Sequence, residues 1–242
     1  MSLKILRGLA VGSLLLALVA AGCTSSSDGG GASGSGSAGA PRPGGTLHVV
    51  RAESFDGWVG DSSAAYASFQ TESAVIEPLV RFSSDGKSLE PGIATSWTYD
   101  PAALTWTFTL REGVVFSDGT PLTSADVAFA ESVWAAGFNF GSSYAAIKTV
   151  ETPDPLTVVF VLSRPDTTIP VKMSCACSGV MPKDFGGRTE KAYYAAPIGA
   201  GAFVVDSWSP AGQIVLSRNP NYYDAPTPVR RQDRDRCGDR RQ

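Results

Sequence analysis

Residues 113–137, GVVFSDGTPLTSADVAFAESVWAAG, predict the end of a strand, a tight turn and a capped helix in one continuous run. The turn is indicated by Asp118 followed by Gly119, because aspartate bonds to its own nearby backbone and glycine tolerates a positive φ. Nothing in this stretch is chemically reactive. The stretch therefore predicts a scaffold and not a catalytic site.

A helix is expected to begin directly after Thr123. This residue stands three positions before Asp126, so its hydroxyl can accept from a free backbone amide while the carboxylate sits at the positive end of the helix dipole. Gly137 is well placed to end the helix. The side expected to be buried carries Val127, Ala130 and Trp134.

Strands are predicted where apolar residues alternate with polar ones. Residues 104–111, LTWTFTLR, alternate throughout, which is typical of a strand with one packed face and one wet face. Residues 156–163 follow the same pattern, and residues 46–49 predict a short first strand. Residues 203–208 and 213–218 flank a short connection and predict a hairpin.

Several blocks resemble, in the same order, the extracytoplasmic solute-binding proteins of peptide and nickel ABC importers, the family of oligopeptide- and dipeptide-binding proteins. The blocks are EPLV at 77–80, LEPGIA at 89–94 with Ser96 and Trp97, LREGV at 110–114, FSDGTPLT at 116–123 with Asp126, Val127 and Phe129, and RNPNY at 218–222. GAGAF at 199–203 departs from the usual GTGPF of the family. The resemblance extends over residues 46–225.

This resemblance implies a mixed α/β fold. The chain would form the first-lobe portion of a two-lobed periplasmic-binding-protein-like fold, with a mixed sheet, flanking helices and the second lobe missing. Receptors of this family close on a ligand by a hinge motion and dock on membrane permease subunits. Peptides in them are held by strand-like main-chain hydrogen bonds, with roomy pockets that tolerate different side chains.

The resemblance also places the loop after the first strand in the ligand cleft. Its candidate ligand-binding residues are Glu53, Ser54, Phe55, Asp56 and Trp58. An ordinary surface loop is the alternative, because Glu53 and Asp56 are single carboxylates without an evident partner.

The N-terminus has the pattern of an export signal, since Lys4 and Arg7 precede an uncharged run over residues 8–22. This run is shorter than the ~20 residues of a membrane-spanning helix, which favours a cleaved signal. VAAGC at 19–23 resembles the lipobox of bacterial lipoproteins, which implies a lipid on Cys23; ordinary secretory cleavage is the alternative. We therefore expect an exported chain, lipid-anchored to the outer face of the cytoplasmic membrane.

These patterns divide the chain into four segments. Residues 1–22 are the lipoprotein signal peptide, 23–45 a Gly- and Ser-rich tether, 46–228 the N-terminal part of the solute-binding lobe, and 229–242 a charged tail. The tail, with six Arg and three Asp, does not continue the family pattern. A truncated or frame-shifted product is the hypothesis, and a solvated or nucleic-acid-seeking tail is the alternative.

The sequence gives little support to a nucleic-acid-binding protein, an enzyme or a nucleotide-binding protein. The net charge of −3 argues against a nucleic-acid partner. His48 is the single histidine and no G-x-S-x-G occurs, so we expect no enzyme and no cofactor. Residues 34–39 match the dinucleotide-binding pattern G-x-G-x-x-G, but they lie in the tether, where no strand is expected before them and no helix after them. Residues 86–88, GKS, resemble the end of a phosphate loop, but Arg81 occupies the position of its first glycine, so this match fails as well.

Three cysteines follow the tether, at 175, 177 and 237. In an extended strand, residues two apart lie ~6.6 Å from each other, so a bond between Cys175 and Cys177 requires a local turn. Free or mispaired thiols are therefore the expectation. A metal site made from Cys175, Cys177 and His48 has no supporting spacing, and none is predicted.

Two functions remain open from the sequence. The first is the substrate-binding component of an ABC importer, which captures peptides or similar small solutes outside the membrane and delivers them to a permease. The alternative is a surface lipoprotein fragment with a structural or interaction role, or with no independent activity.

Overall fold

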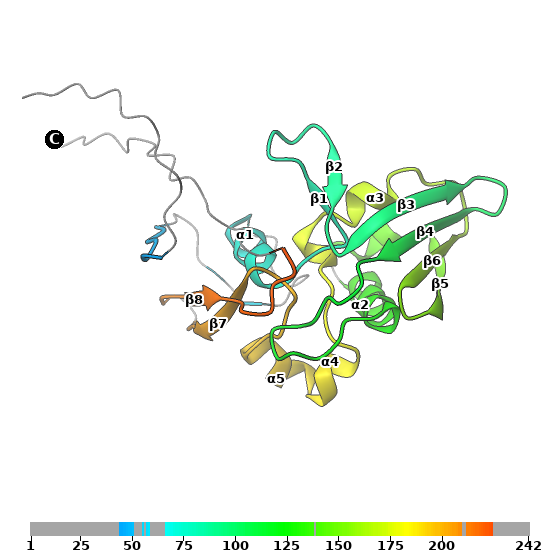
Figure 1. Cartoon of the computed structure of the whole chain (residues 1–242). Helices are drawn as coiled ribbons and strands as arrows, with labels where there is room; N and C mark the ends of the chain where they lie inside the picture. The colour runs from blue at the N-terminus through cyan, green and yellow to red at the C-terminus, as the bar shows by residue number, and fades with distance from the viewer. Residues whose placement is uncertain are drawn as a thin grey trace, which may run out of the picture. The chain divides into compact units, whose positions relative to one another are not determined.

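The computed structural model describes residues 44–50, 55, 57–58, 66–137, 139–209 and 212–224 (Figure 1). Its helices are α1 (Tyr66–Val75), α2 (Ser124–Ala136), η1 (Gly141–Tyr144), α3 (Ile169–Lys172), η2 (Ala176–Ser178), α4 (Asp184–Gly187) and α5 (Glu190–Ala195). Its strands are β1 (Val80–Phe82), β2 (Leu89–Pro91), β3 (Ala94–Asp100), β4 (Thr105–Leu110), β5 (Ile147–Asp154), β6 (Thr157–Leu162), β7 (Phe203–Ser207) and β8 (Val215–Arg218). The mixed α/β class is confirmed, and the strand pairs of the described residues are all antiparallel.

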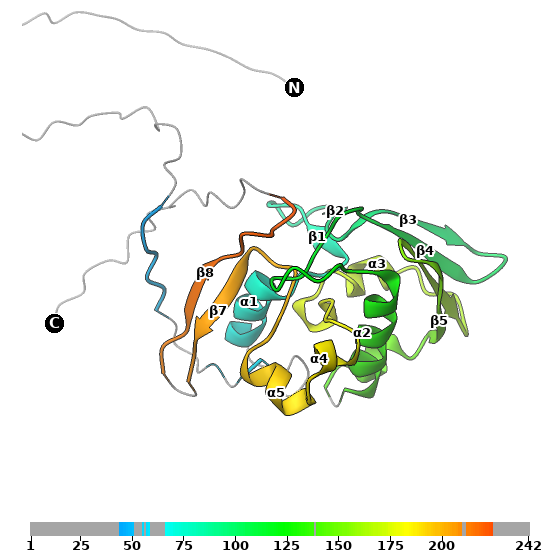
Figure 2. The same ribbon diagram turned by 60° about the horizontal axis from the view of Figure 1, so that its bottom comes forward.

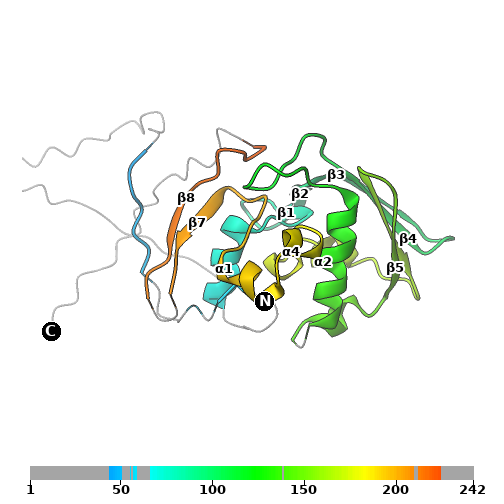
Figure 3. The ribbon, with the colours of Figure 1, turned by 90° about the horizontal axis from the view of Figure 1, so that it is seen from below.

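The largest sheet has the strand order β3-β4-β6-β5. Trp106 of β4 lies opposite Phe160 of β6, and Phe108 lies opposite Val158. All four side chains are buried, because alternation along a strand sends every second residue to the same face. Helix α2 lies along the sheet and contacts β5 and β6 (Figure 3). Both predicted strands are confirmed, each one residue shorter at either end.

The turn before α2 also forms as predicted. The carboxylate of Asp118 accepts a hydrogen bond from the backbone N–H of Thr120 at 3.0 Å. Gly119 has a φ of +87°, in the left-handed region that glycine enters without strain. The backbone N–H of Phe116 donates to the carbonyl of Thr120 at 2.8 Å and closes the turn.

The start of α2 is fixed by Asp126. Its carboxylate accepts from the backbone N–H of Thr123 at 2.7 Å and from the Thr123 hydroxyl at 2.9 Å. The other carboxylate oxygen accepts from the backbone N–H of Lys183 at 2.7 Å, so the helix start is tied to the segment before α4. Gly137 is the C-cap, as predicted. The predicted inner face is buried, with Val127, Ala130 and Trp134.

Asp126→Ala is expected to lower the free energy of unfolding by about 2 kcal/mol, because two backbone N–H groups lose a charged acceptor. Urea unfolding followed by circular dichroism measures this change. Glu112→Ala, which removes an exposed carboxylate, is the control and is expected to stay within about 0.5 kcal/mol of the parent. Equal unfolding midpoints for the two variants would contradict the capping role.

The predicted hairpin is confirmed, whereas the predicted first strand is wrong. Strands β7 and β8 pair with Phe203 opposite Arg218, and the hairpin lies beside α1 (Figure 2). Residues 46–49 are not a strand, and the side chains of Leu47 and Val49 are 60% and 62% exposed. None of the described strands pairs with this segment, so its alternating pattern has no ladder to join.

The glycine-rich turn before β7 connects distant parts of the chain. The backbone N–H of Gly201 donates to the carbonyl of Val75 at 2.8 Å, and the N–H of Ser117 donates to the carbonyl of Gly199 at 2.8 Å. The side-chain amide of Asn219 donates to the carbonyl of Gly201 at 2.8 Å. Sequence blocks far apart along the chain therefore meet at the end of α1.

A second connection ties the last described residues to the segment after α1. The hydroxyl of Tyr223 donates to the carboxylate of Glu77 at 2.9 Å, and Arg81 lies 3.5 Å from the same carboxylate. Arg81 also contacts Asp224 at 3.2 Å. Burial raises the pKa of Glu77 to about 7, and the charge of Arg81 works against this rise.

The expectation of free thiols at Cys175 and Cys177 is wrong. The two cysteines form a disulfide, with their Cα atoms 5.1 Å apart. The local turn that such a bond requires is supplied by η2, which begins directly after Cys175 and brings the two side chains together. Cys237 lies outside the described residues.

Several predictions fall on residues that the structure does not describe. They are the signal peptide, the tether up to residue 43, the lipidation site Cys23 and the charged tail. In the part that is described, no helix is long and apolar enough to cross a bilayer. The same residues contain no group of three or more potential metal ligands.

Candidate functional site

Two of the five predicted ligand-binding residues are described, Phe55 and Trp58, whereas Glu53, Ser54 and Asp56 are not. The rings of Phe55 and Trp58 meet edge to face, with their centroids 4.9 Å apart. The ring of Trp208, which follows β7, lies 5.7 Å from Phe55 and 6.5 Å from Trp58. The loop after residues 46–49 thus contributes to a three-ring aromatic cluster.

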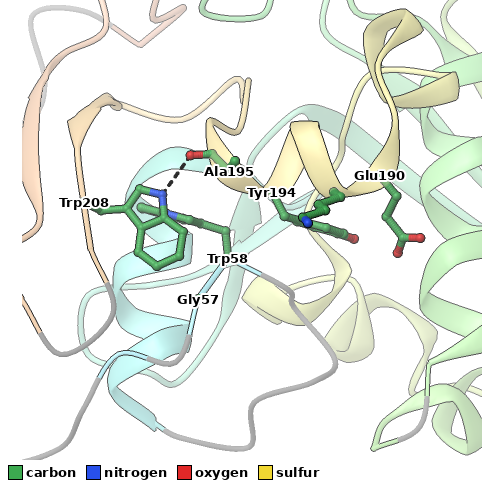
Figure 4. Close-up of a pocket in the computed structure, with 7 residues that line it drawn as sticks. Gly57, Trp58, Glu190, Tyr194, Ala195 and Trp208 are labelled. Atoms are coloured by element: carbon green, nitrogen blue, oxygen red, sulfur yellow. Dashed lines mark hydrogen bonds between the residues drawn. The ribbon is translucent and has the colours of Figure 1, made fainter.

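One side of this cluster borders a cavity of about 410 Å³, here called the outer hollow (Figure 4). Its lining residues come from the loop, from α5 and from the end of β7: Gly57, Trp58, Glu190, Lys191, Tyr194, Ala195 and Trp208. The indole N–H of Trp208 donates to the carbonyl of Ala195 at 2.8 Å, which fixes the ring against the end of α5.

A second cavity of about 430 Å³, here called the inner hollow, shares Trp58, Tyr194 and Glu190 with the first. Its lining is contributed by α1, α2, η1, η2 and the segments around α4 and α5. The lining residues are Trp58, Glu72, Ile76, Ser132, Val133, Trp134, Ala136, Gly137, Phe140, Tyr144, Ala176, Cys177, Gly179, Met181, Phe185, Glu190 and Tyr194. Aromatic rings predominate among its larger side chains.

Two polar groups of the inner hollow are buried without a partner. Both carboxylate oxygens of Glu72 and the indole N–H of Trp58 lack a hydrogen-bond partner among the described residues. The side chains are 1% and 0% exposed. Burial raises the pKa of the Glu72 carboxyl to about 7, because a buried carboxylate loses the solvation that stabilises its charge.

Two other aromatic polar groups of the inner hollow, on Trp134 and Tyr144, have partners. The indole N–H of Trp134 donates to the carbonyl of Gly179 at 3.1 Å. The hydroxyl of Tyr144 lies 3.6 Å from the sulfur of Cys177. Burial also raises the pKa of Tyr194 to about 12, so this hydroxyl remains protonated near neutral pH.

Sequence reasoning missed Glu72, Tyr194 and Trp208. Glu72 lies on the buried side of α1, one turn after Ser68 and three residues before Val75, which are also buried. The polar residues on that side hide the usual helical pattern, so no periodicity marked the carboxylate as internal. Tyr194 and Trp208 come together because the indole N–H of Trp208, just after β7, donates to the carbonyl of Ala195 at the end of α5, a contact that no local pattern encodes.

Chemically, the two hollows suit non-covalent binding. Large aromatic faces with a few polar groups are the usual lining of small-molecule sites. The described lining residues contain no nucleophile paired with a histidine base, the arrangement that hydrolytic triads require.

Comparison with known proteins gives the family. The family model for bacterial extracellular solute-binding proteins, family 5 (middle), matches residues 88–234, which is more than half of the chain. A probable D,D-dipeptide-binding periplasmic protein of Escherichia coli K12 is 28% identical over 172 residues, covering 67% of this chain and 32% of that protein. Di/tripeptide-binding protein 4 of Pseudomonas aeruginosa is 28% identical over 180 residues, covering 64% of this chain and 34% of that protein.

A solved structure of another solute-binding protein is also similar to this chain. The solute-binding protein MoaA of A. tumefaciens R10, in complex with mannopinic acid, superposes with a TM-score of 0.62 at 28% identity, covering 66% of this chain and 34% of that chain. The chain spans about a third of the length of the curated relatives that it matches. The resemblance inferred from the sequence blocks is confirmed. This chain belongs to the bacterial extracellular solute-binding proteins, family 5.

Proposed function

We propose that this chain provides part of the solute-contacting surface of an ABC importer's binding protein, which captures peptides or similar small solutes outside the cytoplasmic membrane. The observation that carries the proposal is the position of Trp58. This residue belongs to the loop that we expect in the ligand cleft, and it borders both the outer and the inner hollow.

The choice of peptides as the solute class is supported by the relatives. Two of them are named for binding D,D-dipeptides and di- or tripeptides. Aromatic walls that accept different side chains suit such a class, because peptide receptors draw affinity from main-chain contacts and tolerance from roomy pockets. Delivery to permease subunits belongs to the same proposal and is supported by the family.

The membrane anchor is a further part of this proposal. It is supported by the VAAGC pattern at 19–23, in which Cys23 would carry the lipid, and by the Gly- and Ser-rich segment after it. The proposed location is the outer face of the cytoplasmic membrane. A surface fragment with only a structural role finds no support in the comparisons.

Calorimetric titration of the purified full chain with defined pools of di- and tripeptides tests the function. At least one pool is expected to bind with a Kd on the order of 0.1–1 mM, because the outer hollow is open to solvent and encloses little of a ligand. Absence of binding heat with every pool at millimolar concentration would contradict the proposal.

The role of Trp58 is tested by Trp58→Phe, which keeps an aromatic ring but removes the indole N–H. Peptide affinity is expected to fall at least about fivefold, since buried aromatic anchors carry much of the energy of a binding surface. Trp97→Phe is the matched control, because Trp97 packs on Phe108 in the sheet and lines neither hollow. Equal losses in the two variants would show that Trp58 acts only through the fold.

A further inference from the structure

The carboxylate of Glu72 requires an explanation. Its side chain is 1% exposed, lines the inner hollow, and has no hydrogen-bond partner on either oxygen among the described residues. Buried polar groups in native proteins are nearly always paired, and a buried charge is costly unless a partner compensates it. An internal carboxylate beside a cavity therefore points to a partner that enters the cavity.

The lining of the inner hollow indicates the charge of that partner. Two carboxylates border it, Glu72 and Glu190, and its described lining residues contain no lysine or arginine. The rings of Trp58, Trp134 and Tyr194 stand around the same space. Aromatic faces attract cations through the negative potential above the ring, so the charges and the rings favour the same class of ligand.

The indole N–H of Trp58 sets a second requirement for a ligand of the inner hollow. The indole N–H of Trp58 is buried without a partner and borders the same hollow. It can only donate, so it would pair with an oxygen of the ligand. A metal ion is disfavoured, because the described residues hold no cluster of three or more potential metal ligands.

We propose that the inner hollow binds the primary ammonium group of a solute, with the carboxylate of Glu72 as its counter-ion and the indole N–H of Trp58 donating to an oxygen of the same solute. The solute would be one of those that the proposed function assigns to this chain, and to that extent the inference rests on it. The ammonium group supplies the charge and the donors that the Glu72 oxygens lack.

The test compares two probes of nearly equal shape, phenethylammonium and 2-phenylethanol, by calorimetric titration of the purified full chain at pH 8. The chain is expected to bind the ammonium probe about tenfold more tightly than the alcohol, since only the ammonium forms a charge-assisted contact. Equal affinity for the two probes, or no saturable binding of the ammonium probe, would overturn the proposal.

Glu72→Gln keeps the size of the side chain and removes the charge. The preference for the ammonium probe is expected to fall below about twofold, while binding of the alcohol stays unchanged. Glu190→Gln is the matched control, because it removes a carboxylate from the same lining at an exposed position, and the preference should remain. Retention of the preference in Glu72→Gln, or its loss in Glu190→Gln alone, would overturn the assignment to Glu72.

The pH dependence of the parent chain provides a test without any substitution. The carboxyl of Glu72 has a pKa raised to about 7 by burial, so affinity for the ammonium probe should increase between pH 5.5 and 8 as the carboxylate forms. The other titratable groups of the described lining are Glu190, Tyr144 and Tyr194, and Tyr193 also interacts with Glu72. Burial raises the pKa of Tyr193 and Tyr194 further above this range. A flat profile for the ammonium probe would count against the proposal.

The two proposals can fail separately. If a peptide pool binds but Glu72→Gln changes neither peptide affinity nor probe preference, the peptide function stands and the ammonium site is wrong. If no peptide binds but the probe preference depends on Glu72, the ammonium site stands and the peptide function is wrong.

Discussion

Gly199→Ala is expected to lower the free energy of unfolding by about 3–5 kcal/mol, or to prevent folding. A Cβ atom at this position would overlap the carbonyl oxygen of Val75 and lie 2.7 Å from its carbonyl carbon. Both are backbone atoms at the end of α1, so no side-chain rotation can relieve the clash, and α1 would have to move away from the turn before β7. Urea unfolding followed by tryptophan fluorescence measures the loss.

Gly119→Ala is the matched control for this substitution. Gly119 has a φ of +87° but nothing within 4 Å of an added Cβ, so alanine there would meet only backbone strain, worth about 1 kcal/mol. Gly199 itself is not among the glycines with a positive φ, so an alanine there would meet the Val75 backbone and not conformational strain. Equal losses of stability in the two variants would therefore contradict a dominant cost from the close approach to Val75.

The close approach at Gly199 explains part of the family's sequence pattern in physical terms. In the GAGAF block, an added Cβ at Gly201 would also lie 2.6 Å from the carbonyl carbon of Val75. Both glycines are therefore required by packing, whereas the positions between and after them hold alanine where the family usually has threonine and proline. The departure from GTGPF thus leaves the close packing intact.

Local patterns predicted the parts of the fold that depend on neighbours in sequence. The alternation in β4 and β6, the Asp118 turn and the Thr123–Asp126 cap are each decided within a few residues, and each is confirmed. A strand also needs a partner. Residues 46–49 carry the alternation but find no paired strand among the described residues, so the same kind of pattern gave a wrong prediction there.

The candidate site was predictable only in part. The loop containing Trp58 was found through resemblance to a family, and the structure places this residue between two hollows. Tyr194 and Trp208 join it through contacts between α5 and the end of β7, which sequence spacing does not reveal. Glu72 was missed because a charged residue in a helix is usually solvated, and only the packing around α1 shows that it is internal.

Glu72→Gln is expected to raise the free energy of unfolding at pH 8 by about 3 kcal/mol and to leave it nearly unchanged below pH 4.5. The pKa of Glu72 is about 7 in the folded chain against an ordinary value of 4.5, so the folded state holds the proton more tightly than the unfolded state. The resulting stabilisation is fully present below about pH 4.5 and is lost as the pH rises through about 7. At about 1.4 kcal/mol per pKa unit, the difference amounts to about 3 kcal/mol.

Glu77→Gln provides the contrast, because Glu77 has the same raised pKa of about 7 but is paired with Arg81 at 3.5 Å and Tyr223 at 2.9 Å. Removing its charge leaves the partly buried Arg81 with one carboxylate fewer, so this variant should gain less stability at pH 8 than Glu72→Gln, or lose stability. Urea unfolding of both variants from pH 4.5 to 8 separates an unpaired buried carboxylate from a paired one. Parallel stability curves for the parent and Glu72→Gln across this range would mean that the inner hollow already supplies Glu72 with a partner.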